Sequence, residues 1–316
     1  MSGVPMGIHR SRRCMPYAAA VGGSGGSGGS EDLILSVPVG AGGALSGPDV
    51  ARVQKALNQI PAEYGGASPR LVEDGRVGPK TLGAISAFQK RHFGWADGRV
   101  DVLGRTHAKL SSLLPGKIQR MTMARQYLSQ AQQCMLAAQA GLLAAGVQLL
   151  SGGGLLGTRD LDLADKHFDI RKSRNAAAAL NQLGQVFARM LGVFARPGGI
   201  LGWMAFEAEP FSNPDFYAFT WAGGYFRPGE YAGWMRLDTV YLSAFYDKAT
   251  DDNRIQTIVH ELAHFVGPTA GDLIDDYAYG QQGDPSMLAL TPYRKQHNAE
   301  RIANYAFEAR FVRPPM

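Results

Sequence analysis

The chain has 316 residues, of which 45% are hydrophobic and 19% charged, as is typical of a globular protein long enough for two domains. Its formal net charge is +5, but Arg10, Arg12 and Arg13 supply three of these charges, and residues 1–30 contain no acidic residue. The rest of the chain therefore carries only about +2, which is too weak and too scattered to predict nucleic-acid binding.

The sequence also argues against a disulfide-stapled protein and against a membrane span. Its two cysteines, Cys14 and Cys134, imply no disulfide framework. No unbroken apolar run reaches the roughly 18 residues that a membrane span needs. The longest candidate, residues 141–157, contains Gln148 and several glycines, which favours a buried helix end. The apolar segment after the basic N-terminal residues is too short for a secretory signal, so export would use a route without an ordinary signal peptide.

Residues 1–45 are predicted to be a flexible tail and linker because they include GGSGGSGGS and a second glycine-rich stretch. Residues 46–115 then form a small helical unit, in which apolar residues recur at helical spacing in three short segments. Two turns with the same sequence, DGRV, separate these segments at 74–77 and 97–100.

The small unit resembles the peptidoglycan-binding-like domains found on many cell-wall enzymes. The resemblance rests on VQKALN, on DGRVGPKTLGAISAFQK and on GRVDVLGRTHAKL. The matching signature positions are Asp74, Gly75, Gly78, Thr81, Ala84, Ile85, Phe88 and Gln89. The resemblance implies a three-helix fold that binds glycan or stem peptide, so peptidoglycan is an expected partner, although such domains also act as spacers or docking modules. Taken singly, most of these residues are expected to shape turns, cap helices or fill the core.

Residues 117–316 are predicted to form a second domain of the α+β class. A long helix is expected over 117–150, because apolar residues recur at steps of three and four, and a second helical stretch ends before Pro197. Residues 200–246 are rich in aromatic residues and glycine and alternate in polarity, which predicts short strands or hairpins. A further helix follows, so the order is helices, then strands, then a helix.

That further helix contains the sequence HELAH. His260 and His264 are four residues apart, so both imidazoles lie on one helix face, where they can share one Zn²⁺ ion. Glu261 is offset from the two ligands and can take a proton from a metal-bound water as general base. Two structural histidines beside a solvated acid would be the alternative interpretation.

A catalytic zinc usually needs a third protein ligand, and the sequence offers several. One known pattern places a histidine six residues after the second, but that position is Ala270. Glu300 on a later helix is a second candidate. Asp272, Asp275 and Asp276 in the segment after the helix are the others. Spacing alone leaves these alternatives open.

The segment HELAHF…DDYAYG resembles the aspzincin metalloendopeptidases, the group of deuterolysin and the peptidyl-Lys metalloendopeptidases. The resemblance extends to DKHFDI, DTVYLSAFYD and HNAERIANYAF. It implies a zincin-like fold with Asp276 as third zinc ligand and Tyr279 as hydrogen-bond donor to the oxyanion. This chain departs from the family because its Gly and Thr are separated in GPTAGD, its loop before Asp276 is longer, and Glu300 replaces an aspartate. The longer loop keeps Asp272 and Asp275 as alternatives to Asp276.

The sequence thus predicts a zinc metalloendopeptidase that hydrolyses protein or peptide substrates, secreted or held in the cell envelope and directed to the bacterial cell wall. One alternative is a hydrolase of peptidoglycan stem peptides or a secreted antibacterial effector. The non-enzyme alternative is a wall-binding protein on an inactive zincin scaffold. The intact set of His260, Glu261 and His264 argues against the last, because a site without catalysis has no chemical need for all three.

Overall fold

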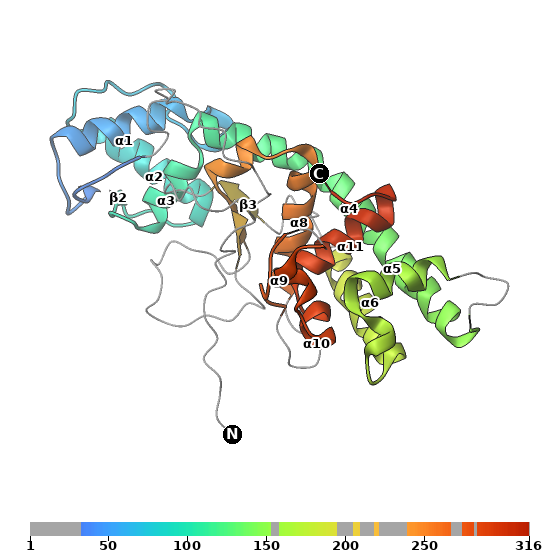
Figure 1. Cartoon of the computed structure of the whole chain (residues 1–316). Helices are drawn as coiled ribbons and strands as arrows, with labels where there is room; N and C mark the ends of the chain where they lie inside the picture. Colours follow the sequence, from blue (N-terminus) through green and yellow to red (C-terminus); the bar gives the residue numbers. More distant parts are fainter. Residues whose placement is uncertain are drawn as a thin grey trace.

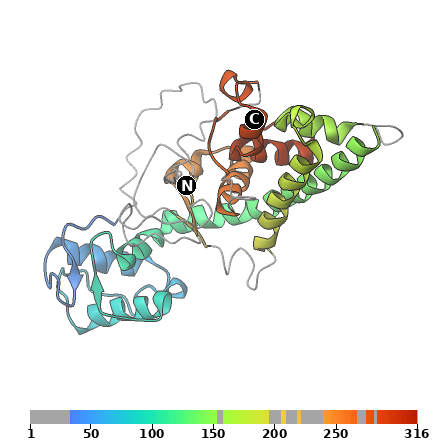
Figure 2. The ribbon, with the colours of Figure 1, turned by 90° about the horizontal axis from the view of Figure 1, so that it is seen from below.

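The computed structural model describes residues 33–152, 158–194, 205–208, 218–220, 239–266, 274–280 and 283–315. Within these ranges the protein is mostly helical with few strands, although the sequence predicts an α+β second domain. A small domain at the N-terminal end is followed by a larger helical region, and one long helix, α4, runs from the first into the second (Figures 1 and 2). The segment 1–30 lies outside the described residues.

The small domain has three helices and a short two-stranded sheet. The helices are α1 Pro48–Gln59, α2 Pro79–Phe93 and α3 Arg105–Ser112, with a 3₁₀ turn η1 Ala62–Tyr64 after α1. Strands β1 Val39–Gly40 and β2 Arg99–Val100 pair antiparallel. Leu33, Leu35 and Val39, which the sequence places in a flexible segment, are buried in this domain's core. These apolar side chains pack against residues of α1, α2 and α3. The glycine content of the segment does not predict this packing.

Gln54 on α1 holds the first DGRV turn in place. Its Nε2 donates to Asp74 Oδ1 at 3.0 Å and to Thr81 Oγ1 at 3.2 Å, and its Oε1 accepts the N–H of Gly75 at 2.9 Å. Gly75 has φ +68°, and a Cβ there would approach the carbonyl oxygen of Gly47 to 3.1 Å. These signature residues therefore build the turn, as expected for most of the motif.

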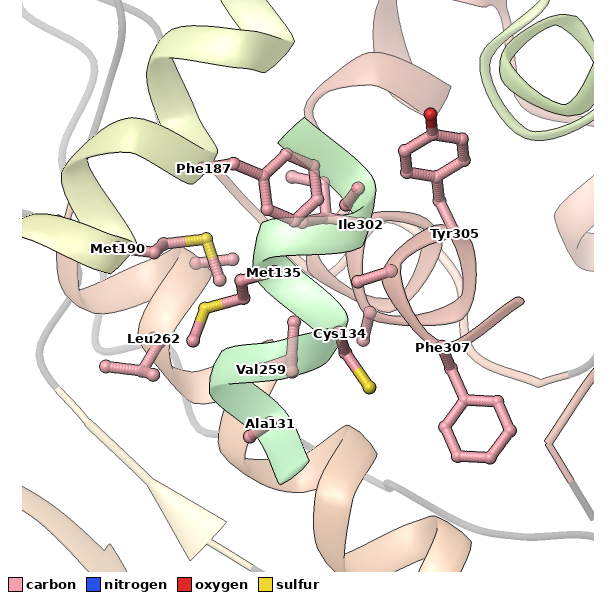
Figure 3. Close-up of a cluster of buried hydrophobic side chains, with 14 of the residues drawn as sticks. Ala131, Cys134, Met135, Phe187, Met190, Val259, Leu262, Ile302, Tyr305 and Phe307 are labelled. Carbon is pink, nitrogen blue, oxygen red and sulfur yellow. The ribbon is translucent and has the colours of Figure 1, made fainter. Parts of the chain in front are cut away.

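Helix α4, Pro115–Leu150, is the central helix of the larger region. It packs against α5 Arg159–Phe168, α6 Ala176–Phe194, α8 Asp251–Val266 and α11 Ala299–Phe311. Figure 3 shows Ala131, Cys134 and Met135 of α4 among side chains of α6, α8 and α11. The N-terminal part of α4 is fixed by Arg120, which is buried and makes two hydrogen bonds to Asp247 at 2.8 and 2.7 Å.

The length and composition of α4 differ from the expectation that no apolar segment could cross a membrane. By length and composition alone, α4 is long and apolar enough to cross a membrane, but core helices of soluble proteins can have the same length and composition. Its Leu142 and Ala145 are buried against the neighbouring helices, whereas Leu143, Val147 and Leu150 are exposed. The expected buried helix end is therefore buried on one face only.

The second predicted helical stretch is divided into α5 and α6. Asp169 adopts a left-handed conformation with φ +49° and ends α5, and a short 3₁₀ turn η2 Ile170–Lys172 leads on. The Asp169 carboxylate accepts a hydrogen bond from Lys295 Nζ at 2.6 Å. A tertiary ion pair thus stabilises a break that helical periodicity does not reveal.

Three short strands lie within the region where strands are expected. Strand β5 Thr239–Leu242 is central, with β3 Ala205–Ala208 parallel to it and β4 Ala218–Phe219 antiparallel. The rest of 195–238 lies outside the described residues. A 3₁₀ turn, η4 Ala244–Lys248, then leads from β5 to α8, and the short helices α9 Pro285–Leu288 and α10 Pro292–Gln296 precede α11.

Candidate metal centre

Helix α8 buries both of its histidines and the glutamate between them. The helix begins where Thr250 Oγ1 accepts the N–H of Asn253, and apolar residues line the face that packs on α4 and α11. His260, Glu261 and His264 are at most 1% exposed. Three buried polar side chains in one helix are costly unless they bind something, so their surroundings decide their role.

The structure brings three potential ligand atoms together. His260 Nε2 and His264 Nε2 are 3.1 Å apart, and Asp276 Oδ1 lies 3.1 Å from each of them. An ion held tetrahedrally at roughly 2.0–2.1 Å needs ligand atoms roughly 3.3–3.4 Å apart. The three atoms thus form a nearly equilateral triangle of almost the size that zinc requires, and they are the group in the described chain that could hold a metal.

Hydrogen bonds on the far side of each ring orient the two histidines. His264 Nδ1 lies 2.9 Å from the carbonyl oxygen of Ile274, to which only a protonated Nδ1 can donate. His260 Nδ1 lies 3.2 Å from Glu300 Oε2. Both contacts favour a proton on Nδ1, which leaves each Nε2 lone pair directed at the centre of the triangle. Glu300 is therefore a partner of a ligand, and the structure does not bring it to the triangle as a ligand itself.

Asp276 and Asp275 have different environments. The Asp276 side chain is 6% exposed, and its Oδ1 faces both histidines. Asp275 Oδ1 instead accepts the backbone N–H of Asp276 at 2.6 Å, so this carboxylate supports the turn. Asp272 lies outside the described residues. Of the two described aspartates, only Asp276 faces the histidines.

Helix α11 holds the Asp276 segment against α8. The backbone of Asp275 donates to the carbonyl of His297 at 2.8 Å and accepts from the N–H of Ala299 at 3.1 Å. Asn298 Nδ2 donates to the carbonyl of Ala278 at 2.9 Å, and Asn304 Nδ2 donates to that of Gly280 at 3.2 Å. The two asparagines were not predicted to belong to the site. The sequence does place both in HNAERIANYAF, a segment of the aspzincin resemblance, but assigns neither of them a role.

Tyr279 lies beside the histidines, and Glu261 follows His260 in the helix. The Tyr279 ring is nearly parallel to that of His260, with centroids 6.2 Å apart and an interplanar angle of 17°. Tyr279 is partly buried and Glu261 is buried. Both residues therefore belong to the immediate surroundings of the triangle, as a catalytic role for either one would require.

The charges at the centre are strongly coupled. Burial opposes a charged imidazolium, but the adjacent Asp276 carboxylate outweighs this effect and raises the pKa of both His260 and His264. Burial likewise opposes a charged Asp276, and the two histidines outweigh it and hold the pKa of this carboxyl well below its usual range. The Asp276 carboxylate is thus stabilised by positive charge beside it, which a proton or a divalent cation can supply.

The donor set fits zinc. Two imidazole nitrogens and one carboxylate oxygen form one of the common ligand sets for a catalytic zinc that retains a position for water. Asp276 Oδ2 is buried and has no hydrogen-bond partner within the described ranges. This is expected of a carboxylate that binds a cation. The predicted ligands His260, His264 and Asp276 are therefore the residues that could hold the metal.

Comparison with known proteins bears on the small domain. Residues 46–103 match the family described as "Putative peptidoglycan binding domain". This segment is thus similar to peptidoglycan-binding domains, and the similarity suggests peptidoglycan binding. The match ends before α4, so there is no family evidence for a peptidase or for the aspzincin resemblance. No curated protein and no solved structure matches the chain.

Proposed function

We propose that this protein is a zinc-dependent metallopeptidase that a peptidoglycan-binding domain directs to the bacterial cell wall. The observation that carries the proposal is the convergence of His260, His264 and Asp276 within 3.1 Å of one another, next to the buried Glu261. A structural zinc site usually uses four protein ligands, whereas three ligands with a nearby carboxylate are typical of hydrolysis. The peptidoglycan-binding domain suggests a location at the cell wall or envelope.

In this mechanism His260, His264 and Asp276 hold the metal, and Glu261 moves the proton. A zinc ion bound there would supply Lewis acidity and lower the pKa of a water molecule to about 7. Glu261 accepts a proton from the attacking water and later donates it to the leaving amine. The Tyr279 hydroxyl donates a hydrogen bond to the developing oxyanion. His260, Glu261 and His264 all lie on helix α8, which fixes the position of the Glu261 carboxylate relative to both histidines.

The substrate class follows from the combination of the two parts. A domain that binds peptidoglycan raises the local concentration of cell-wall peptides at the second domain. The amides of the stem peptides are peptide bonds of the kind that a metallopeptidase hydrolyses. The peptidoglycan-binding domain thus favours stem peptides, and proteins located at the wall form the second substrate class.

Two substrates and one variant test the proposal. Purified full-length protein is loaded with one equivalent of zinc and incubated with isolated sacculi or with casein. New amino groups should appear with at least one of the two substrates, and a chelator should abolish their release until zinc is added back. Release of amino groups by Glu261→Gln at the wild-type rate would exclude the mechanism. A protein that binds sacculi and zinc but cleaves neither substrate would instead be a wall-binding protein on an inactive scaffold.

A further inference from the structure

An exposed aromatic pair lies at the end of helix α2 in the small domain. Gly94 adopts a left-handed conformation with φ +76° directly after Phe93, and this reversal turns the chain back on itself. Trp95 then stacks on Phe93, with ring centroids 5.4 Å apart and an interplanar angle of 21°. Trp95 is 41% exposed, so a large part of the indole contacts solvent. The pair forms an aromatic surface that water covers at a free-energy cost.

The turn that follows Trp95 is rigid. Gln89 Nε2 donates to Asp97 Oδ1 at 2.6 Å and to Thr106 Oγ1 at 3.0 Å. Gln89 Oε1 accepts the backbone N–H groups of Asp97 and Gly98 at 3.0 and 2.9 Å. Trp95 thus lies between the C-cap of α2 and a turn that hydrogen bonds hold in place. The Trp95 segment therefore loses little conformational entropy when a ligand binds.

The fold itself does not require an exposed tryptophan at this place. Gln54 holds the first DGRV turn through the same kind of bonds that Gln89 makes to the second one. The first network spans 20 residues from Gln54 to Asp74, and the second only eight from Gln89 to Asp97. Near the end of α1 the corresponding apolar side chain is Ile60, which is 3% exposed and belongs to the core. An exposed aromatic pair therefore distinguishes the second turn from the first.

Positive charge accompanies the aromatic pair. The guanidinium of Arg105 lies over the Phe93 ring, 5.7 Å from its centroid, and Arg105 is exposed. Residues 46–115 contain ten Lys and Arg residues against six Asp and Glu residues. Peptidoglycan consists of acetylated hexosamines with lactyl-linked peptides that end in carboxylates. Aromatic rings suit the C–H faces of the sugars, and the cations suit the carboxylates.

We propose that Trp95, Phe93 and Arg105 form the surface through which this domain contacts peptidoglycan glycan strands. A hexosamine ring packs on the exposed indole face of Trp95, and Arg105 pairs with a carboxylate of the attached lactyl peptide. This assignment rests on the proposed binding of peptidoglycan, to which it adds the contacting residues. Phe93 stacks against the Trp95 indole. Both residues lie within the matched segment 46–103.

Co-sedimentation with purified sacculi tests the assignment. Full-length protein carrying Glu261→Gln is used, so that hydrolysis does not consume the ligand, and Kd is obtained from depletion curves. Trp95→Ala should weaken binding about tenfold or more, as expected for an aromatic anchor. Trp95→Phe should retain part of the affinity. Val72→Ala is the matched control, because Val72 is a 74% exposed apolar residue of the same domain, and this variant should bind like the parent.

The outcomes separate the two claims. If the parent does not sediment with sacculi, the proposed peptidoglycan binding itself is wrong. If the parent binds and Trp95→Ala binds equally well, the assigned surface is wrong and peptidoglycan binding stands. Arg105→Gln should lower affinity several-fold and reduce its salt dependence, and an unchanged salt dependence would contradict the role of Arg105. Thermal unfolding of each variant must match that of the parent, and Trp95→Phe serves as the test if Trp95→Ala does not fold.

Discussion

Replacement of Asp276 by asparagine tests the assignment of the third zinc ligand. Asp276 Oδ1 lies 3.1 Å from both Nε2 atoms, and Asp276 is the only anionic member of the triangle. Asparagine retains the shape and one oxygen but removes the charge. The removal of one partner from a buried charge pair costs about 3–5 kcal/mol. At 1.4 kcal/mol per factor of ten, the Kd for zinc should rise roughly 150- to 4,000-fold.

Asp275→Asn is the matched control in the adjacent position. Asp275 Oδ1 accepts the backbone N–H of Asp276, and an asparagine oxygen can accept the same bond. Zinc affinity should therefore change less than about tenfold in this variant. Titration against a competing chelator measures both constants. The reasoning is refuted if Asp276→Asn binds zinc as tightly as the wild type, or if Asp275→Asn loses zinc to the same extent as Asp276→Asn.

Three further predictions concern residues away from the triangle. Glu300→Gln should weaken zinc binding about 10- to 100-fold, because Glu300 orients His260; chelator competition measures this, and unchanged affinity contradicts the role. The hydrogen bond to His167 lowers the pKa of Glu308 to about 2 from its usual 4.5. The ionised Glu308 therefore stabilises the folded protein fully above pH 4.5, and this stabilisation is lost as the pH falls toward 2. Glu308→Gln should remove about 2–3 kcal/mol of the change in the free energy of unfolding between pH 4.5 and pH 2, as measured by denaturant unfolding at several pH values. The same pH dependence of this free energy in both proteins would contradict the prediction. Gln89→Leu should destabilise the small domain by about 2–4 kcal/mol in the same assay, because Gln89 makes five hydrogen bonds; a change below 1 kcal/mol contradicts that estimate.

Local sequence patterns predicted the helices of the small domain better than the path between them. The positions of α1 and α2 followed from apolar residues at helical spacing. The burial of Leu33 could not be predicted, because it depends on the surface that α1 and α3 present after folding. The break at Asp169 was missed for a similar reason, since its partner Lys295 is 126 residues away.

The candidate site could be predicted in part from spacing. The positions of His260 and His264, four apart on a helix, required that both rings lie on one face. The choice of Asp276 over Asp275 depends on which carboxylate turns inward after a loop, and sequence spacing does not fix that direction. The contact between Glu300 and His260 spans 40 residues and arises only when α11 packs on α8. The sequence therefore named Glu300 as a candidate but could not assign it the role of orienting His260.

The most direct test of the central claim compares metal content and hydrolysis in the wild type and in Glu261→Gln. Both proteins should contain about one zinc per chain, because Glu261 is not a ligand of the triangle. Release of amino groups from sacculi or casein should fall by at least two orders of magnitude in the variant, because it lacks the general base. A wild-type protein without bound zinc, or a variant that cleaves at the wild-type rate, would contradict the account.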